Sequence, residues 1–207
     1  MATQNFIVAA IAGTVLASTV STATAGISSV SGDIDILTES ADFRGNRTES
    51  SNVRIYQEQD TFLLPASVSI DMDGAMESGD SLANGVEVNS YYFHFDPVGR
   101  DRTVATGSVT FGEQIIGIMV NGQTLFLSDP VLANGSIVPN TGSASRGLDA
   151  GGDVISVSAD GFTLNIESLT SSASYDQFRV LTAAPIPTPG AMALLGLGGL
   201  AAARRRR

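Results

Sequence analysis

The chain contains a single histidine, His94, in the segment Tyr91–Asp96. Alternation along a strand would place three side chains on each face. The two sets are Tyr92, His94 and Asp96 on one face, and Tyr91, Phe93 and Phe95 on the other. A histidine with an aspartate two residues away could act as a general base for one of the many serines. No G-x-S-x-G elbow is present to place that serine, and one histidine without cysteine leaves only carboxylates for a zinc site. We therefore expect His94 to be a structural or surface residue between aromatic rings.

Carboxylates recur at Asp71, Asp73 and Glu77, within the segment Asp71–Asp80. Alternate carboxylates followed by glycine resemble the start of a calcium loop, in which hard oxygen ligands converge on one ion. The full EF-hand pattern is missing, because Leu82 stands where its twelfth-position glutamate would be. The alternative is a solvated turn after a strand. Calcium is the one cofactor that the sequence suggests.

The charge and composition of the chain exclude several classes of protein. All 21 acidic residues lie between Gly26 and Pro185 with only seven of the eleven Arg, which gives this segment a net charge of −14. Such a domain repels phosphates, so we exclude a nucleic-acid partner. Because cysteine is absent, a buried core or bound cations must replace disulfides. No carboxylate pair is marked out for glycoside hydrolysis and Trp is absent, so we expect no catalysis.

Short alternating segments bounded by Gly, Asn, Asp and Ser predict an all-β domain. The expected strands are Asp33–Leu37, Asn52–Gln57, Thr61–Asp71, Val86–Asp96, Thr103–Phe111, Gln114–Val120, Gln123–Ser128, Asp153–Ala159, Phe162–Glu167 and Tyr175–Thr182. Asn121-Gly122 and Asp160-Gly161 predict hairpin turns. No helical periodicity exceeds two turns, and we interpret Pro139–Gly152 as a flexible surface loop. About ten strands at this spacing predict a sandwich or jelly roll.

The N-terminal 25 residues have the features of a secretory signal peptide. They contain no charged side chain, and residues 6–20 form an uninterrupted run of apolar and small residues. Ala23 and Ala25 satisfy the small-x-small rule for signal peptidase, which predicts cleavage before Gly26. An uncleaved membrane anchor is the alternative, because the first residues lack Lys and Arg.

The C-terminus combines a proline-rich spacer, an apolar segment and a cationic end. The apolar segment Gly190–Ala203 has 14 residues and would span about 21 Å as a helix, which is short against a bilayer core of about 30 Å. It is followed by Arg204, Arg205, Arg206 and Arg207, which would remain on the cytoplasmic side. We expect this short, glycine-containing helix to be a processed signal. The alternative is an ordinary membrane tail.

This C-terminal order resembles the PEP-CTERM sorting signal, which an exosortase is thought to process. Pro187, Thr188 and Pro189 occupy the motif, with Thr188 in place of the usual Glu, and Gly190 follows. Over roughly residues 52–182 the chain is similar to a domain that recurs in such proteins and has no established activity. The residues that carry this similarity are Val88–Gly99, Gly107–Phe111, Ile115–Ile118 and Asp176–Val180.

The resemblance implies three regions: a signal peptide at 1–25, an acidic all-β domain at 26–184 and a sorting signal at 185–207. It implies export to the cell surface or extracellular matrix, with transient inner-membrane association through both termini. The implied partners are signal peptidase and an exosortase-like enzyme, with exopolysaccharide as a candidate. The expected role is structural or adhesive. The alternatives are a carbohydrate-binding module acting on exopolysaccharide and, third, a secreted hydrolase.

Overall fold

The computed structural model describes residues 26–44, 48–99, 101–139, 146–171 and 174–185. The signal and apolar helices expected at the two ends of the chain lie outside these residues. The described part contains thirteen strands and one α-helix. None of its helices has the length and apolar character needed to cross a membrane.

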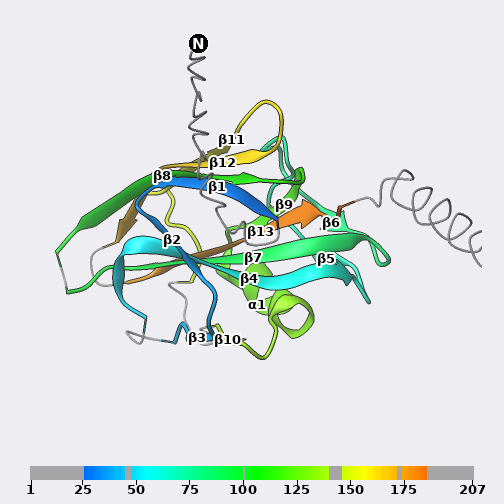
Figure 1. The fold of residues 1–207 in the computed structure, drawn as a ribbon, viewed down its shortest axis with the longest axis horizontal. Coiled ribbons are helices and arrows are strands. Elements are labelled where there is room, and N and C mark those ends of the chain that lie inside the picture. The colour runs from blue at the N-terminus through cyan, green and yellow to red at the C-terminus, as the bar shows by residue number, and fades with distance from the viewer. Residues whose placement is uncertain (1–25, 45–47, 100, 140–145, 172–173, 186–207) are drawn as a thin grey trace, which may run out of the picture.

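Two antiparallel-rich sheets form the body of the fold, one above the other in Figure 1. Sheet A has the order β1 (Ile27–Gly32), β8 (Thr103–Phe111), β12 (Thr163–Ser171) and β11 (Val154–Val157). Sheet B has the order β2 (Ile34–Leu37), β4 (Ser50–Leu63), β7 (Glu87–Asp96), β13 (Asp176–Ala183) and β9 (Ile115–Met119). Within these sheets only the pair β2–β4 is parallel.

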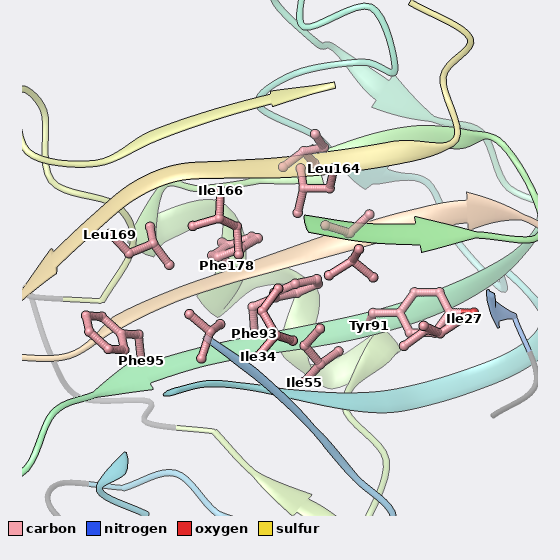
Figure 2. Close-up of a cluster of buried hydrophobic side chains, with 14 of the residues drawn as sticks. Ile27, Ile34, Ile55, Tyr91, Phe93, Phe95, Leu164, Ile166, Leu169 and Phe178 are labelled. Carbon is pink, nitrogen blue, oxygen red and sulfur yellow. The ribbon is translucent and has the colours of Figure 1, made fainter. Parts of the chain in front are cut away.

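Apolar side chains from both sheets form one buried cluster between them. Phe93 of β7 and Phe178 of β13 stack there with ring centroids 4.3 Å apart, and they face Leu164 and Ile166 of β12 across the gap (Figure 2). These residues recur at every second position of their strands, which directs them to one face of each sheet. The two sheets therefore pack face to face around a common core.

The helix α1 (Gly122–Leu132) forms a third layer on the outer face of sheet B (Figure 1). Leu125 and Leu132 of the helix belong to a second apolar cluster, with Tyr92 of β7 and Leu181 of β13. Two short pairs of strands complete the fold: β3 (Ala41–Asp42) with β10 (Ile137–Val138), and β5 (Val68–Ser69) with β6 (Ser81–Leu82). Sheet B is thus buried on both faces.

The structure confirms the all-β class and most of the expected strands, and Thr103–Phe111 is a strand with the predicted bounds. It also confirms that β11 and β12 pair antiparallel around Asp160-Gly161. The expected strand Thr61–Asp71 is wrong as a single element, because β4 ends at Leu63 and Pro65 follows before the short β5. The strand β1 was not predicted.

The expected hairpin at Asn121-Gly122 is wrong, because Gln123–Ser128 is helical. Asn121 has φ −89° rather than the positive φ of a type I′ turn. It is instead the N-cap of the helix, and its side-chain oxygen accepts a hydrogen bond from the backbone N–H of Gln123. Gly122 has a different reason to be glycine: a Cβ there would lie 2.3 Å from the Arg146 carbonyl oxygen. The Asn-Gly pair therefore starts a helix against a neighbouring backbone.

Candidate functional site

Three neighbouring strands place polar side chains on the outer face of sheet B, beneath α1. Register across β4, β7 and β13 aligns them in rows: Arg54, His94 and Gln177 form one row, and Tyr56, Tyr92 and Arg179 form the next. In a sandwich without a third layer, these positions would face water. Here His94, Gln177 and Arg179 are all at most 1% exposed. Each of these polar groups therefore needs a partner within the protein.

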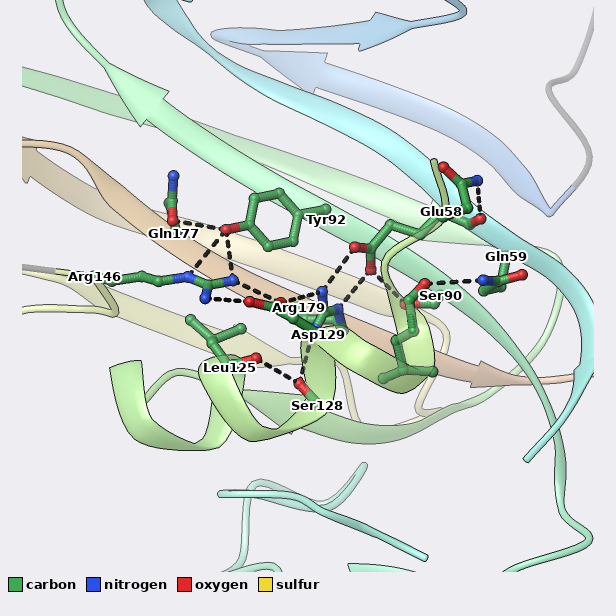
Figure 3. Close-up of polar contacts among 12 residues, drawn as sticks. Glu58, Gln59, Ser90, Tyr92, Leu125, Ser128, Asp129, Arg146, Gln177 and Arg179 are labelled. Carbon is green, nitrogen blue, oxygen red and sulfur yellow. Dashed lines mark hydrogen bonds and ion pairs between the residues drawn. The ribbon is translucent and has the colours of Figure 1, made fainter. Parts of the chain in front are cut away.

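Four charged residues form an alternating chain in this layer (Figure 3). Arg179 donates from Nε and one terminal nitrogen to both oxygens of Glu58 on β4. The same guanidinium donates to Asp129 of α1 at 3.1 Å and to Ser128. Asp129 also accepts two hydrogen bonds from Arg146. Two cations and two anions are thus matched, and the chain of contacts carries no net charge.

The ion pairs fasten separate parts of the sequence to sheet B. Glu58 and Arg179 belong to the sheet, whereas Asp129 belongs to α1 and Arg146 to the segment that follows residues 140–145. Burial alone would lower the pKa of Arg179, but the charges of Glu58 and Asp129 outweigh it and raise that pKa. The guanidinium therefore stays charged, and removing Arg179 would leave the buried Glu58 without its ion-pair partner.

The loop expected at Pro139–Gly152 lies at the surface only in part: Pro139, Arg146 and Gly147 are buried, whereas residues 149–151 are exposed. Arg146 is 4% exposed, and Leu148 donates its backbone N–H to the carbonyl of Val120. The guanidinium of Arg146 also donates to the hydroxyl of Tyr92. The small polar residues of this segment suggested a solvated loop, but Arg146 forms a buried ion pair with Asp129; the other charged residue of the segment, Asp149, is exposed.

A second line of hydrogen bonds runs from Tyr92 to His94 through Gln177. Because Arg146 can only donate, the Tyr92 hydroxyl accepts from it and donates its own proton to Oε1 of Gln177, 2.6 Å away. The Gln177 amide nitrogen then donates to Nδ1 of His94 at 3.0 Å. His94 is therefore the neutral tautomer with its proton on Nε2. Burial raises the pKa of Tyr92 and lowers the pKa of His94 to about 3, the latter aided by Arg54.

These contacts make His94 a poor general base. Its Nδ1 already accepts a hydrogen bond, and its Nε2 has no hydrogen-bond partner among the described residues. The carboxylate of Asp96 lies 3.9 Å from Nε2, beyond hydrogen-bond range. The pKa of Asp96 is raised to about 6 by burial and by Glu49. His94 packs against Phe43, with ring centroids 4.6 Å apart, and no serine hydroxyl bonds to it in the described part of the chain.

The residues proposed for calcium lie in the loop between β5 and β6, and two of them bond to the protein itself. Asp71 Oδ2 accepts the backbone N–H groups of Val120 and Asn121, and Asp71 Oδ1 accepts the Thr124 hydroxyl. Asp73 Oδ1 accepts the N–H groups of Ala75 and Glu77. Within the described residues, no group of three or more His, Cys, Asp or Glu could hold a metal ion. Calcium binding stays a prediction.

A groove lies between that loop and the β11–β12 turn. Its volume is about 410 Å³, and it is lined by Gly74, Ala75, Gln114, Ile115, Val157, Ser158, Ala159, Asp160 and Gly161. The polar groups that it presents are an amide, a hydroxyl and a carboxylate, and it has no aromatic lining. Asp160 accepts hydrogen bonds from Ser158 and from the Phe162 N–H, and these lower its pKa. The groove is therefore a hydrogen-bonding surface.

Most of the predicted signal residues lie outside the described part of the chain. They are Ala23, Ala25, Pro187, Thr188, Pro189, Gly190, Arg204, Arg205, Arg206 and Arg207. Gly26 is described: it has φ +91°, and a Cβ at this position would lie 1.8 Å from the Tyr91 hydroxyl. Only glycine suits that conformation and contact.

Sequence reasoning missed the buried ion cluster of Glu58, Asp129, Arg146 and Arg179. One signal was available, because Arg179 interrupts an otherwise apolar stretch of its strand, Phe178–Leu181, in a domain with only seven arginines. Comparison of the chain with protein-family models, with curated proteins and with solved structures gives no match.

Proposed function

We propose that this chain is an exported structural or adhesive protein of the cell surface or extracellular matrix, sorted by an exosortase-type system. The observation that carries the proposal is the C-terminal order of Pro187-Thr188-Pro189, an apolar segment and four arginines. A signal-peptide pattern ending at Ala25 accompanies it at the other end. The acidic domain lies between these two signals.

The ends of the folded domain support this reading. The Gly26 carbonyl accepts a hydrogen bond from the Gly112 N–H, and the Ala184 N–H donates to the Glu87 carbonyl. Gly26, which directly follows the predicted signal-peptidase site, and Ala184, three residues before Pro187, are therefore both hydrogen-bonded within the described domain. Cleavage before Gly26 or at the Pro187 motif would remove no residue of the ion cluster or of the two apolar clusters.

Mass spectrometry of the exported protein, purified from its native host, tests the proposal at both ends. We expect the mature chain to begin Gly26-Ile27-Ser28 and to lack the four terminal arginines. Retention of residues 1–25 would instead favour an uncleaved anchor. Retention of Arg207 in a host with an active exosortase would overturn the sorting claim.

A pair of variants separates processing from simple membrane anchoring. Replacing Pro187 and Pro189 with Ala should leave a full-length, membrane-bound precursor, because proline holds the chain in the extended form that proteolytic sites accept. Pro185→Ala is the matched control: it removes a proline that lies outside the motif and should leave processing unchanged. Normal processing of the double variant would contradict recognition of the Pro-Thr-Pro motif.

The second candidate function is carbohydrate binding in the exopolysaccharide matrix. The groove beside Gln114 favours it, because the lining amide, hydroxyl and carboxylate can hydrogen-bond to sugar hydroxyls. A glycan array probed with the exported protein distinguishes the two functions. Binding that is lost in both Gln114→Ala and Asp160→Ala would replace the structural role with this one. The third candidate, a hydrolase, would need a base other than His94.

A further inference from the structure

The helix α1 has an unusual distribution of side chains between its two faces. Its buried stripe consists of Leu125, Ser128, Asp129 and Leu132. Its exposed stripe consists of Gln123, Phe126, Leu127 and Pro130, at the same helical spacing on the opposite side. Phe126 is 47% exposed and Leu127 is 61% exposed. The charged residue of this helix is therefore buried, while large apolar side chains face outward.

The cause of this inversion is the ion cluster. Asp129 must face sheet B to reach Arg146 and Arg179, and the helical period then turns Phe126 and Leu127 toward the outside. A surface helix of a globular protein usually has the reverse arrangement. Contiguous apolar side chains on a protein surface commonly mark an interaction site.

The same face is free of charge in a strongly acidic domain. Between Glu113 and Arg146 the only charged residue is Asp129, and Asp129 is buried within its ion pairs. The domain as a whole carries 21 acidic residues against seven Arg, so 20 of its acidic residues lie outside the segment between Glu113 and Arg146. Two copies of such a domain repel one another wherever their carboxylates approach. The outer face of α1 is a surface through which they can meet without that cost.

We infer that the outer face of α1 (Gln123, Phe126, Leu127 and Pro130) is a self-association surface that binds the same face of a second copy of this chain. A twofold arrangement would place Phe126 and Leu127 of each copy against those of the other. The helix is only about 16 Å long, so the contact falls short of the roughly 800 Å² per partner of a stable dimer. The association is therefore weak and gains importance where copies are crowded.

Sedimentation velocity of the exported protein tests this inference. From about 10 µM to about 1 mM the weight-average mass should rise toward that of a dimer, as a dissociation constant within that range requires. The rise should be larger in about 1 M NaCl than in about 0.05 M NaCl, because salt screens the repulsion between acidic domains. Leu127→Glu should abolish the concentration dependence, and Phe126→Glu should do the same.

The matched control is Val104→Glu on sheet A, where the valine is 50% exposed. It adds the same charge on a different surface and should leave self-association unchanged. Thermal unfolding of each variant checks that the fold is retained. A wild type that stays monomeric at all concentrations, or equal effects of Leu127→Glu and Val104→Glu, would overturn the inference. A monomer that binds phosphatidylcholine vesicles through Leu127 would also overturn it, in favour of a lipid surface.

Discussion

The two faces of sheet B are both buried, but different interactions stabilise them. The inner face packs aromatic and aliphatic side chains such as Phe93 and Phe178 against sheet A. The outer face combines an apolar cluster with an ion chain centred on Arg179. Phe178 and Arg179 are consecutive residues of β13, and one lies in each of these two environments. A single strand therefore contributes both to a non-directional core and to a directional polar network.

The difference lies in how much each face tolerates change. The free energy of apolar contacts depends on buried area and volume, so substitution by another apolar side chain of similar size lowers the stability only modestly. A buried charge is stabilised only by its specific partner, because water cannot reach it when that partner is removed. We therefore expect the outer face to be the more sensitive of the two, and the following substitutions test that ranking.

The largest effect is expected for Arg179→Met. Methionine fills much of the same volume, but Glu58 then loses its two-point partner in a site that is 0% exposed on both side chains. The free energy of unfolding should fall by about 3–5 kcal/mol, as measured by urea denaturation. Arg44→Met is the matched control: Arg44 also donates twice to one carboxylate, Asp42, but its side chain is 51% exposed. Its loss should be much smaller.

A second substitution identifies the cause of that loss. In the double variant Glu58→Met with Arg179→Met, no unpaired charge remains at this position, and Asp129 keeps its two hydrogen bonds from Arg146. The double variant should be more stable than Arg179→Met alone. If it is less stable, the network stabilises the fold by attraction beyond the avoidance of an unpaired charge, and the proposed ranking loses its explanation.

The next effect concerns Asp176, a carboxylic acid at the end of the inner face that forms no ion pair with the described residues. Asp176 is 1% exposed, and its Oδ2 has no hydrogen-bond partner in the described part of the chain. Burial, with the charges of Asp153 and Asp149, raises its pKa to about 8. The folded protein therefore keeps a proton that the unfolded chain loses above its ordinary pKa of 3.8. The contribution of Asp176 to stability is greatest below that value and is lost as the pH rises toward 8.

Asp176→Asn removes this pH dependence. One pKa unit corresponds to about 1.4 kcal/mol, so half of the shift would make the variant about 2–3 kcal/mol more stable than wild type at about pH 8. The two proteins should differ little at about pH 4. Urea denaturation at both pH values measures the difference. A gain of the same size at both would mean that ionisation of Asp176 is not its source.

The inner face could be predicted from the sequence, and the outer face could not. Period-two alternation in the segment Tyr91–Asp96 predicted that Tyr91, Phe93 and Phe95 share one face, and in the structure that face packs into the core between the sheets. It also grouped Tyr92 and His94 on one face, but nothing in that pattern indicates that a third layer covers them. Burial of that face depends on α1, whose Asp129 contacts Arg179 of β13, and these two residues lie far apart in the chain.

The helix α1 was missed for a related reason. Apolar residues occur on both of its faces, and its buried stripe contains Ser128 and Asp129, so the helical period of hydrophobicity is weak. Asn121-Gly122 is a common hairpin signal, and it misled in this case because the close approach of Arg146 requires the glycine. The tertiary contacts of this segment, which include the ion pairs of Asp129 and the packing of Leu125 and Leu132, are not visible in its local sequence.

A smaller effect is expected on the apolar face. Phe178→Leu keeps an apolar side chain in the stack with Phe93 and removes only part of its volume. The free energy of unfolding should fall by about 1.5 kcal/mol, well below the loss for the neighbouring Arg179→Met. Urea denaturation under the same conditions compares the two directly. A larger loss for Phe178→Leu than for Arg179→Met would reverse the ranking of the two faces.

The smallest effect concerns Asp71, which holds α1 over the outer face and is also the first residue proposed for calcium. Its carboxylate accepts two backbone N–H groups, from Val120 and Asn121, and the Thr124 hydroxyl. Asp71→Ala should therefore lower the free energy of unfolding by about 1 kcal/mol in the presence of a chelator, because these donors must then bond to water. Glu77→Gln is the control, since Glu77 is exposed and removing its charge should have little effect in the chelator.

Millimolar calcium then separates the two roles of Asp71. A ligand of the native state stabilises it by mass action. If calcium raises the melting temperature of the wild type but not of either variant, both carboxylates take part in binding the ion, and Asp71 does so in addition to bonding to α1. If calcium leaves all three proteins unchanged, the calcium prediction is wrong and Asp71 acts only on α1. A loss in Asp71→Ala that appears only with calcium present would instead show that the cation, rather than the hydrogen bonds to Val120 and Asn121, keeps the helix in place.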